Sequence, residues 1–188
     1  MKIALTGHTK GIGKAIKDVL EPENTVIGFS RTNGFNINNP QAIFDIAKDC
    51  DVFVNNAQYK DYQTQLFELF WNHWCREHKT IININSQSKY PEMKARFGDY
   101  VTNKQKLEAV TKDATLNPDR GMGKYNCRVT NMIVGWTDTD MIKFLRHVKK
   151  MPPSTVANAV KWCIDQPQDL QIYELALWHQ NTTPKLGK

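Results

Sequence analysis

The stretch that decides the fold is Lys2-Ile3-Ala4-Leu5-Thr6-Gly7-His8-Thr9-Lys10-Gly11-Ile12-Gly13, at the start of the chain. Its first five residues have the character of a short buried strand, and three closely spaced glycines follow them. Apolar residues then recur at helical spacing as far as Leu20, and Pro22 stands where such a helix would stop. Residues 25–29 are typical of a second strand. The sequence therefore predicts a strand–loop–helix–strand unit of about thirty residues.

A glycine loop between a first strand and its helix is typical of a dinucleotide-binding site. Glycines let the backbone turn sharply and approach a pyrophosphate, and the N–H groups at the start of the helix then point at the phosphates. An ordinary turn between a strand and a helix is the alternative interpretation. The residues that we expect to contact the cofactor are Gly7, Thr9, Lys10, Gly11, Ile12 and Gly13.

The end of the second strand distinguishes the two nicotinamide cofactors. A carboxylate there would hydrogen-bond the adenosine ribose of NAD, whereas an arginine accommodates the 2′-phosphate of NADP. This chain has Ser30-Arg31 at that place and no carboxylate, and Lys10 in the glycine loop supplies a second positive charge. The sequence therefore predicts NADP, with NAD as the less favoured cofactor.

Strands and helices continue to alternate along the rest of the chain. We expect further strands at 51–55, 80–85, 128–134 and 172–178, a short one at 35–37, and helices at 41–48, 66–74, 99–115 and 154–165. This alternation predicts an α/β fold, a single Rossmann-like doubly wound parallel sheet with helices on both faces. We place the domain at residues 1–179 and treat 180–188 as a loose C-terminal tail.

Composition and charge narrow the class of protein. The chain has 188 residues, 40% of them hydrophobic and 23% charged, which are ordinary globular values. Its net charge of +6 comes from lysines and arginines spread along the whole chain. A solvated basic face explains that charge best, a patch that attracts anionic substrates comes second, and nucleic acid binding comes a distant third.

The sequence also predicts where the protein works. Apolar runs are too short to span a bilayer and no signal-peptide core is present, so we expect a cytoplasmic protein without a membrane partner. The four cysteines are far apart in the sequence and no histidine lies at metal-ligand spacing from them. We therefore expect reduced thiols and no metal.

Five short motifs, taken in order, resemble those of the short-chain dehydrogenase/reductase family. They are the glycine loop, Asn55-Asn56-Ala57, Ser86, the segment Tyr100-Val101-Thr102-Asn103-Lys104, and Asn131 with the turn Val134-Gly135-Trp136-Thr137-Asp138-Thr139. None of them is specific alone, but their order and spacing together are. The resemblance extends from the first residue to the last expected strand.

This resemblance implies an NADP-dependent oxidoreductase that interconverts a carbonyl and an alcohol. Carbonyl reduction needs a proton from a positioned acid, and Tyr100 would be that general acid and base. The Lys104 ammonium would lower the pKa of the phenol, which is about 10 when free, and would also hold the nicotinamide ribose. Ser86 would bind the substrate oxygen. The remaining cofactor contacts would come from Asn55, Asn56, Ala57 and Thr139.

Two of these assignments have competitors in the sequence. The pattern Tyr-x-x-x-Lys also occurs as Tyr90 and Lys94, but a proline follows that tyrosine and disfavours helical geometry there. We therefore favour Tyr100 and Lys104, which one helical turn would place on the same face. Ser88 is the alternative to Ser86.

The chain departs from the family pattern between its fourth and fifth expected strands. It is shorter there than typical members, and the family's catalytic asparagine has no clear counterpart. Counting back from Ser86 leads to Gln63, which either serves instead or belongs to an altered proton relay. This departure favours the alternative function, a non-catalytic NADP-binding sensor or partner module on the same fold.

Two further segments bear on substrate and partners. Residues 141–147 alternate apolar and cationic side chains, which suits an anionic substrate with an apolar part or, equally, an amphipathic helix that covers the cleft. The aromatic residues between Leu66 and Trp74 would form core or half of a helical interface. By resemblance, we expect a homodimer or homotetramer and a small carbonyl or alcohol substrate.

Overall fold

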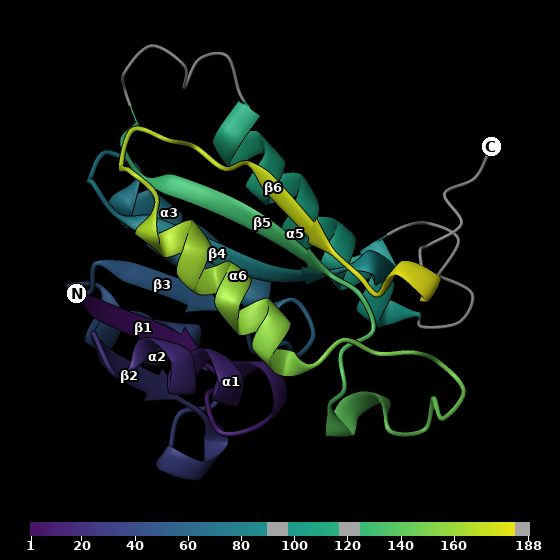
Figure 1. Ribbon diagram of the computed structural model, residues 1–188. Helices are drawn as coiled ribbons and strands as arrows, with labels where there is room; N and C mark the ends of the chain where they lie inside the picture. Colours follow the sequence, from purple (N-terminus) through teal and green to yellow (C-terminus); the bar gives the residue numbers. More distant parts are fainter. Residues whose placement is uncertain (90–97, 117–124, 183–188) are drawn as a thin grey trace.

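A parallel sheet forms the centre of the structure, a computed structural model that describes residues 1–89, 98–116 and 125–182 (Figure 1). Its strands, as far as the chain is described, are β1 (Lys2–Thr6), β2 (Thr25–Phe29), β3 (Val52–Asn55), β4 (Thr80–Ser86), β5 (Arg128–Val134) and β6 (Glu174–Leu177). They lie in the order β2-β1-β3-β4-β5-β6, and every neighbouring pair is parallel. The chain thus winds outward from β1 first to one side and then to the other, as predicted.

Helices cover both faces of this sheet. The helices α1 (Gly11–Leu20) and α6 (Pro153–Asp165) pack side by side on one face, the near one in Figure 1. The opposite face carries α2 (Pro40–Ala47), α3 (Tyr62–Trp74) and α5 (Asp99–Leu116). The predicted doubly wound fold is confirmed. Within the described residues, no helix combines the length and the apolar character that a bilayer span requires.

Strand residues alternate between the two helical layers. In β1, Ile3 and Leu5 pack under α1 and α6, whereas Ala4 packs under α2 and α3. Because both faces are covered, all residues of β3 and β5 are buried, and β3 is apolar except for Asn55, whereas β4 and β5 also bury asparagines. The aromatic side chains between Leu66 and Trp74 are at most 7% exposed, so they are core rather than an interface. A homodimer or homotetramer stays a prediction.

One expected strand is absent. Residues 35–37 form no strand; after β2 the chain enters a short 3-10 helix, η1 (Arg31–Asn33), and turns at Gly34, whose φ is +87°. Phe35 then folds back: its N–H donates to Ser30 O at 2.9 Å, and its ring packs edge-on against Phe29. Apolar character at Phe35 therefore reflects packing over the end of β2. The other predicted strands and helices are present, with bounds shifted by a few residues.

A row of asparagines crosses the sheet beneath α3 and α5. The register aligns Asn55 of β3, Asn83 of β4 and Asn131 of β5. Asn55 Nδ2 donates to Asn83 Oδ1 at 2.9 Å, and Asn83 Nδ2 donates to Thr111 Oγ1 of α5 at 2.9 Å. Buried polar groups are stable only when paired. The row therefore fixes how α5 sits on the sheet, and α5 carries Tyr100 and Lys104.

The contact between the asparagine row and α5 can be tested with an isosteric change. Thr111→Val removes the acceptor of Asn83 without changing volume, and we expect a loss of about 1–2 kcal/mol in the free energy of unfolding. Thr102→Val, on the same helix and partly exposed, should change it by less than about 0.5 kcal/mol. Urea denaturation of both variants measures the difference. Equal effects would show that the row does not anchor α5.

Candidate active site

The loops that leave the carboxyl ends of the strands enclose one cleft of about 870 Å³. Its lining comes from the glycine loop after β1, the turn after β2, residues 56–59 after β3, the end of β4 with η2 (Gln87–Lys89), and residues 134–144 after β5. Open parallel sheets bind ligands at this edge, beside the point where the winding direction changes. The cleft is therefore the candidate active site.

The cleft brings together nearly all residues predicted from the sequence. Those that line it are Gly7, Thr9, Lys10, Gly11, Ile12, Gly13, Arg31, Asn56, Ala57, Ser86, Tyr100, Lys104 and Thr139. Asn55 does not line it: the residue is fully buried, and its amide donates to Asn83 and to Gln63 O. Asn55 thus supports the sheet instead of a ligand. The competing pair Tyr90 and Lys94 lies outside the described residues.

The glycine loop leaves room for a ligand at the start of α1. Gly7 and Gly11 have φ values of +71° and +52°, in the left-handed region that favours glycine. A Cβ on Gly13 would lie 2.1 Å from Gly7 O, so no other residue fits this close approach. Lys10, at the N-cap, makes no capping hydrogen bond, and the first turn of α1 holds no acidic residue. The loop and helix start thus fit a pyrophosphate.

The turn after β2 holds Arg31 at the cleft. Ser30 N donates to Asn33 Oδ1 at 2.8 Å, and Asn33 Nδ2 donates to Gly28 O at 2.7 Å, which together fix the backbone on both sides of the arginine. The Arg31 side chain is exposed and lines the cleft. A cation is therefore available beside the place where an adenosine ribose would lie.

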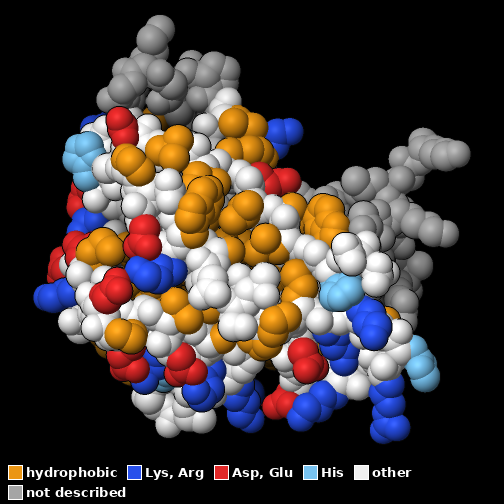
Figure 2. All heavy atoms as spheres, in the orientation of Figure 1, with side chains coloured by type: hydrophobic (Ala, Val, Ile, Leu, Met, Phe, Trp, Pro, Cys, Tyr) orange, Lys and Arg blue, Asp and Glu red, His pale blue; other side chains and the backbone are white. Residues whose placement is uncertain are grey.

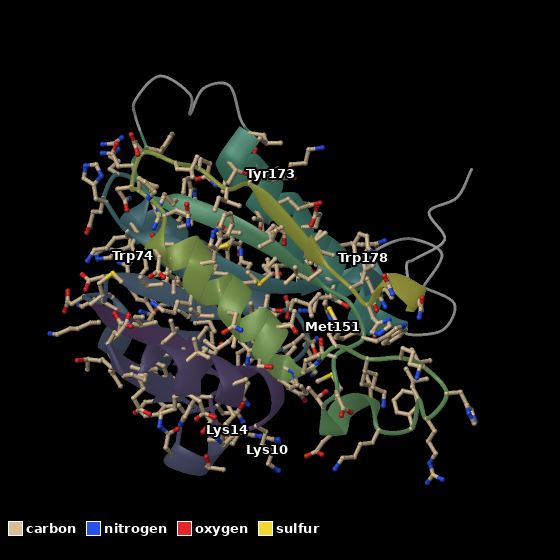
Figure 3. The ribbon with its side chains drawn as sticks, viewed as in Figure 1. Lys10, Lys14, Trp74, Met151, Tyr173 and Trp178 are labelled. Atoms are coloured by element: carbon tan, nitrogen blue, oxygen red, sulfur yellow. The ribbon has the colours of Figure 1, made fainter. Side chains whose placement is uncertain are left out.

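Asp140 was not anticipated from the sequence. It lines the cleft, and its carboxylate accepts a hydrogen bond from Lys143. That bond, and more weakly the charge of Lys10, lower the pKa of Asp140. Figure 3 shows Lys10 at the beginning of α1, beside the loop that follows β5, and Gly11 approaches Thr139 of that loop. Part of the positive field of Lys10 is thus offset by a carboxylate across the cleft.

Ser86 and Tyr100 meet at the end of β4. The phenol and the Ser86 hydroxyl are hydrogen-bonded, and Ser88 N donates to Ser86 Oγ at 3.1 Å. This arrangement favours Ser86 over Ser88 as the partner of the tyrosine. Burial raises the pKa of Tyr100, and the bond to Ser86 offsets only part of that rise.

The expected lowering of the Tyr100 pKa by Lys104 is therefore wrong for this arrangement. The lysine nitrogen lies 5.7 Å from the centre of the Tyr100 ring. Lys104 Nζ instead donates to Gln63 Oε1 at 2.8 Å and to Ile84 O at 2.9 Å. Burial lowers the pKa of Lys104 to about 7, so near neutral pH the lysine carries only part of a positive charge. Helical spacing predicted a shared face but not the direction of the ammonium.

The loop after β5 is not the amphipathic helix that the sequence allowed. It begins with a 3-10 turn, η5 (Asp140–Ile142), and its base is closed by a β-bridge between Thr137 and Met151. Met141 and Phe144 are 67% and 66% exposed and line the cleft. Lysine and arginine side chains gather over this side of the molecule in Figure 2, but the cations of residues 143–150 do not line the cleft.

No protein-family profile matches the chain, and no curated protein matches its sequence. Solved structures do resemble it. A serine dehydrogenase complexed with NADP+ is 17% identical, with 98% of this chain and 97% of that chain covered and a TM-score of 0.74. The chain has the short-chain dehydrogenase/reductase fold. A 3-alpha-hydroxysteroid dehydrogenase from Pseudomonas sp. B-0831 complexed with NADH is 16% identical, at 94% and 95% coverage and a TM-score of 0.70. A short chain dehydrogenase/reductase family protein is 17% identical, at 94% and 95% coverage and a TM-score of 0.68.

The position of Lys104 in this dehydrogenase/reductase fold predicts how stability depends on pH. Burial lowers its pKa from 10.5 to about 7, so the unfolded chain binds a proton that the folded chain has lost at pH values between the two. The free energy of unfolding should therefore rise by about 1.5 kcal/mol from about pH 7 to about pH 8.5. This rise should disappear in Lys104→Met and persist in Lys112→Met, on the exposed side of the same helix. Urea denaturation at the two pH values measures it, and an unchanged rise in Lys104→Met would contradict the assignment.

Proposed function

We propose that the protein is an NADP-dependent oxidoreductase that interconverts a carbonyl and an alcohol. The observation that supports this most directly is the continuity of the cleft, which joins the glycine loop at the start of α1 to Ser86, Tyr100 and Lys104. One end offers uncapped helix N–H groups to a pyrophosphate. The other offers a hydroxyl pair and a lysine to a reacting oxygen. Solved dehydrogenases with this fold, bound to nicotinamide cofactors, support the same function.

Each of the cleft residues Tyr100, Ser86 and Lys104 has a separate role in the proposed reaction. The bound cofactor supplies or accepts the hydride. Tyr100 is protonated at neutral pH, as any phenol is, and can donate its proton to a carbonyl oxygen that is being reduced, although burial raises its pKa and makes it a weaker acid than a free tyrosine. Ser86, hydrogen-bonded to the phenol, lies where it can donate to the same oxygen as negative charge develops. Lys104, which lines the cleft beside them, would hold the nicotinamide ribose.

The choice of NADP depends on Arg31 and on the absence of a carboxylate at the end of β2. Similar solved structures contain NADP+ in one case and NADH in another, so the fold alone does not decide the cofactor. An arginine forms paired hydrogen bonds to a phosphate, which the ribose hydroxyl of NAD would leave unused. Lys10 adds a second, partly offset charge.

The substrate that fits the cleft best is a carbonyl compound with an apolar part. Met141 and Phe144 present two largely exposed apolar side chains to the cleft. The cations among the described lining residues are Lys10, Arg31 and Lys104, which lie on the cofactor side or at the reacting centre. The apolar half of the expectation drawn from residues 141–147 thus gains support, and the anionic half does not.

A non-catalytic NADP-binding module remains the second candidate. The observation that favours it is the state of the acid–base pair: the pKa of Tyr100 is raised, and the Lys104 nitrogen, 5.7 Å from the centre of the Tyr100 ring, donates its hydrogen bonds to Gln63 and Ile84. Both candidates require cofactor binding, and they differ in turnover.

Removing the hydroxyl group of Tyr100 distinguishes the oxidoreductase from the non-catalytic NADP-binding module. Tyr100→Phe should lower the turnover of ketones by about 10²-fold or more, because the proton donor is lost, while the affinity for NADPH changes little. Tyr62→Phe, outside the cleft lining, should behave as the wild type. Absorbance of NADPH follows turnover, and its fluorescence follows binding. Retained turnover in Tyr100→Phe would eliminate the tyrosine as donor, and tight NADPH binding by a wild-type protein that reduces no carbonyl would favour the non-catalytic module.

Reversing the charge at Arg31 tests the cofactor. Arg31→Glu should weaken NADPH about a hundredfold more than NADH, because it places a carboxylate against the 2′-phosphate. Arg146→Glu is the matched control, since it makes the same change in an exposed residue outside the cleft lining. Fluorescence titrations with both cofactors measure the ratio. Equal losses for NADPH and NADH would show that Arg31 does not select the phosphate.

A further inference from the structure

Gln63 lies at the centre of a closed set of buried hydrogen bonds beneath Lys104. Its side chain is 2% exposed, in the first turn of α3. Gln63 Nε2 donates to Asn55 O at 2.7 Å and to Ile84 O at 3.0 Å, while its Oε1 accepts from Lys104 Nζ at 2.8 Å. One amide thus connects β3, β4 and α5 at the place where β3 ends and β4 continues.

The two strand carbonyls fix which way this amide points. A carbonyl oxygen accepts hydrogen bonds and never donates them. The Nε2 of Gln63 must therefore face Asn55 O and Ile84 O, because the reversed amide would place its oxygen against both. Its Oε1 is left facing Lys104. The acceptor that the lysine meets is thus determined by the strands and is independent of the charge on the lysine.

These contacts suit both protonation states of Lys104. An ammonium has three N–H groups, and a neutral amine has two N–H groups and a lone pair. Gln63 Oε1 and Ile84 O occupy two N–H groups in either state. The third position of the nitrogen is a donor in one state and an acceptor in the other, and Lys104 lines the cleft.

Among the residues that the structure describes, the groups around Lys104 supply no counterion for its charge. Tyr100 lies one turn earlier on α5, and Ser86 at the end of β4 is bonded to it. Glu108 lies one turn later, but its carboxylate accepts from Asn85 and Asn131. On α3, the group that faces the lysine is the neutral amide of Gln63. Burial is the cause of the lowered pKa of Lys104, with no contribution from a neighbouring charge.

We propose that Gln63 is a positioning residue that holds the Lys104 nitrogen at the cleft in both of its protonation states, so that the lysine gains or loses a proton without moving. A glutamate in its place would bind the ammonium as an ion pair and could not donate to the two carbonyls. A methionine would leave the lysine and both carbonyls without their partner. Any effect of Gln63 on turnover rests on the proposed oxidoreductase function, whereas the hydrogen bond between Gln63 and Lys104 does not depend on that function.

The first test uses the unaltered protein without cofactor. The side-chain amide signals of Gln63 in a ¹⁵N NMR spectrum should shift with a midpoint near that of Lys104, at about pH 7. Signals of Gln65, two residues later on α3, should not follow that midpoint. A Gln63 amide that is unaffected through the titration would overturn the proposal.

Two substitutions should move the lysine in opposite directions. Gln63→Glu should raise the Lys104 pKa by about 1–3 units, because a carboxylate replaces the amide oxygen, and Gln63→Met should lower it, because an acceptor of the ammonium is lost. Lysine ¹³Cε NMR reads the pKa directly. Gln65→Glu, on the same helix, is the matched control and should leave it within about 0.3 units. Equal shifts in the Gln65 and Gln63 variants would overturn the proposal.

The pH dependence of kcat distinguishes a positioning role of Gln63 from a purely structural one, because a structural role would leave it unchanged. In Gln63→Glu the pH profile of kcat should shift upward with the Lys104 pKa, by about 1–3 units, while KM for the ketone changes little. An unshifted profile together with a shifted Lys104 pKa would confine Gln63 to a structural role. If the wild type reduces no carbonyl, the oxidoreductase proposal fails, while the two NMR tests still decide the contact.

Discussion

The burial of the Lys104 nitrogen is the constraint on which one half of the cleft depends. Placing an ammonium away from water costs several kcal/mol unless it is paired or loses its proton. Here the nitrogen meets two neutral oxygens and no carboxylate, and its pKa falls to about 7. Each of those oxygens must be held by something else. Gln63 is held by carbonyls of β3 and β4, and α5 is held on the sheet by the asparagine row. The hydrogen bonds of Lys104 therefore depend on the relative placement of four elements: β3, β4, α3 and α5.

The other half of the cleft is shaped by the absence of side chains. Gly7 and Gly13 approach each other too closely for any Cβ, and Asn56 Nδ2 donates to Thr6 O at 2.9 Å, which keeps the loop against the strand. What faces the cleft there is backbone N–H, which attracts anions without any titratable group. The backbone N–H groups of the glycine loop do not titrate, whereas Lys104, in the other half of the cleft, does so close to neutrality.

The fold was predictable because its signals are local. Buried parallel strands leave apolar runs, and the glycine loop is required by backbone conformations that other residues avoid. The errors arose where a contact between distant segments decides the outcome. Phe35 resembles a strand residue but packs on Phe29, and the Tyr100 pKa depends on its burial and on its bond to Ser86, while the Lys104 nitrogen bonds to Gln63. Counting residues located Gln63, but its contact with Lys104 exists only after β3, α3 and α5 are assembled.

Under the proposed oxidoreductase function, proton supply to the substrate would follow from the opposite pKa shifts of Tyr100 and Lys104. The phenol of Tyr100 keeps its proton beyond the pH at which a free tyrosine would lose it, whereas Lys104 releases its proton near neutrality. At pH 7 the pair therefore holds a firmly bound proton on the phenol and a loosely bound one on the lysine. A carbonyl oxygen that gains negative charge can take the first, because its own proton affinity rises as hydride arrives. A lysine charge that favoured the phenolate would also lower the pKa of the phenol, and the Tyr100 pKa is instead set by burial and by the hydrogen bond to Ser86. A hydrogen bond from Ser86 to the substrate oxygen would strengthen as negative charge develops there, and it would then stabilise the transition state more than the resting site, which is the condition for an increase in rate.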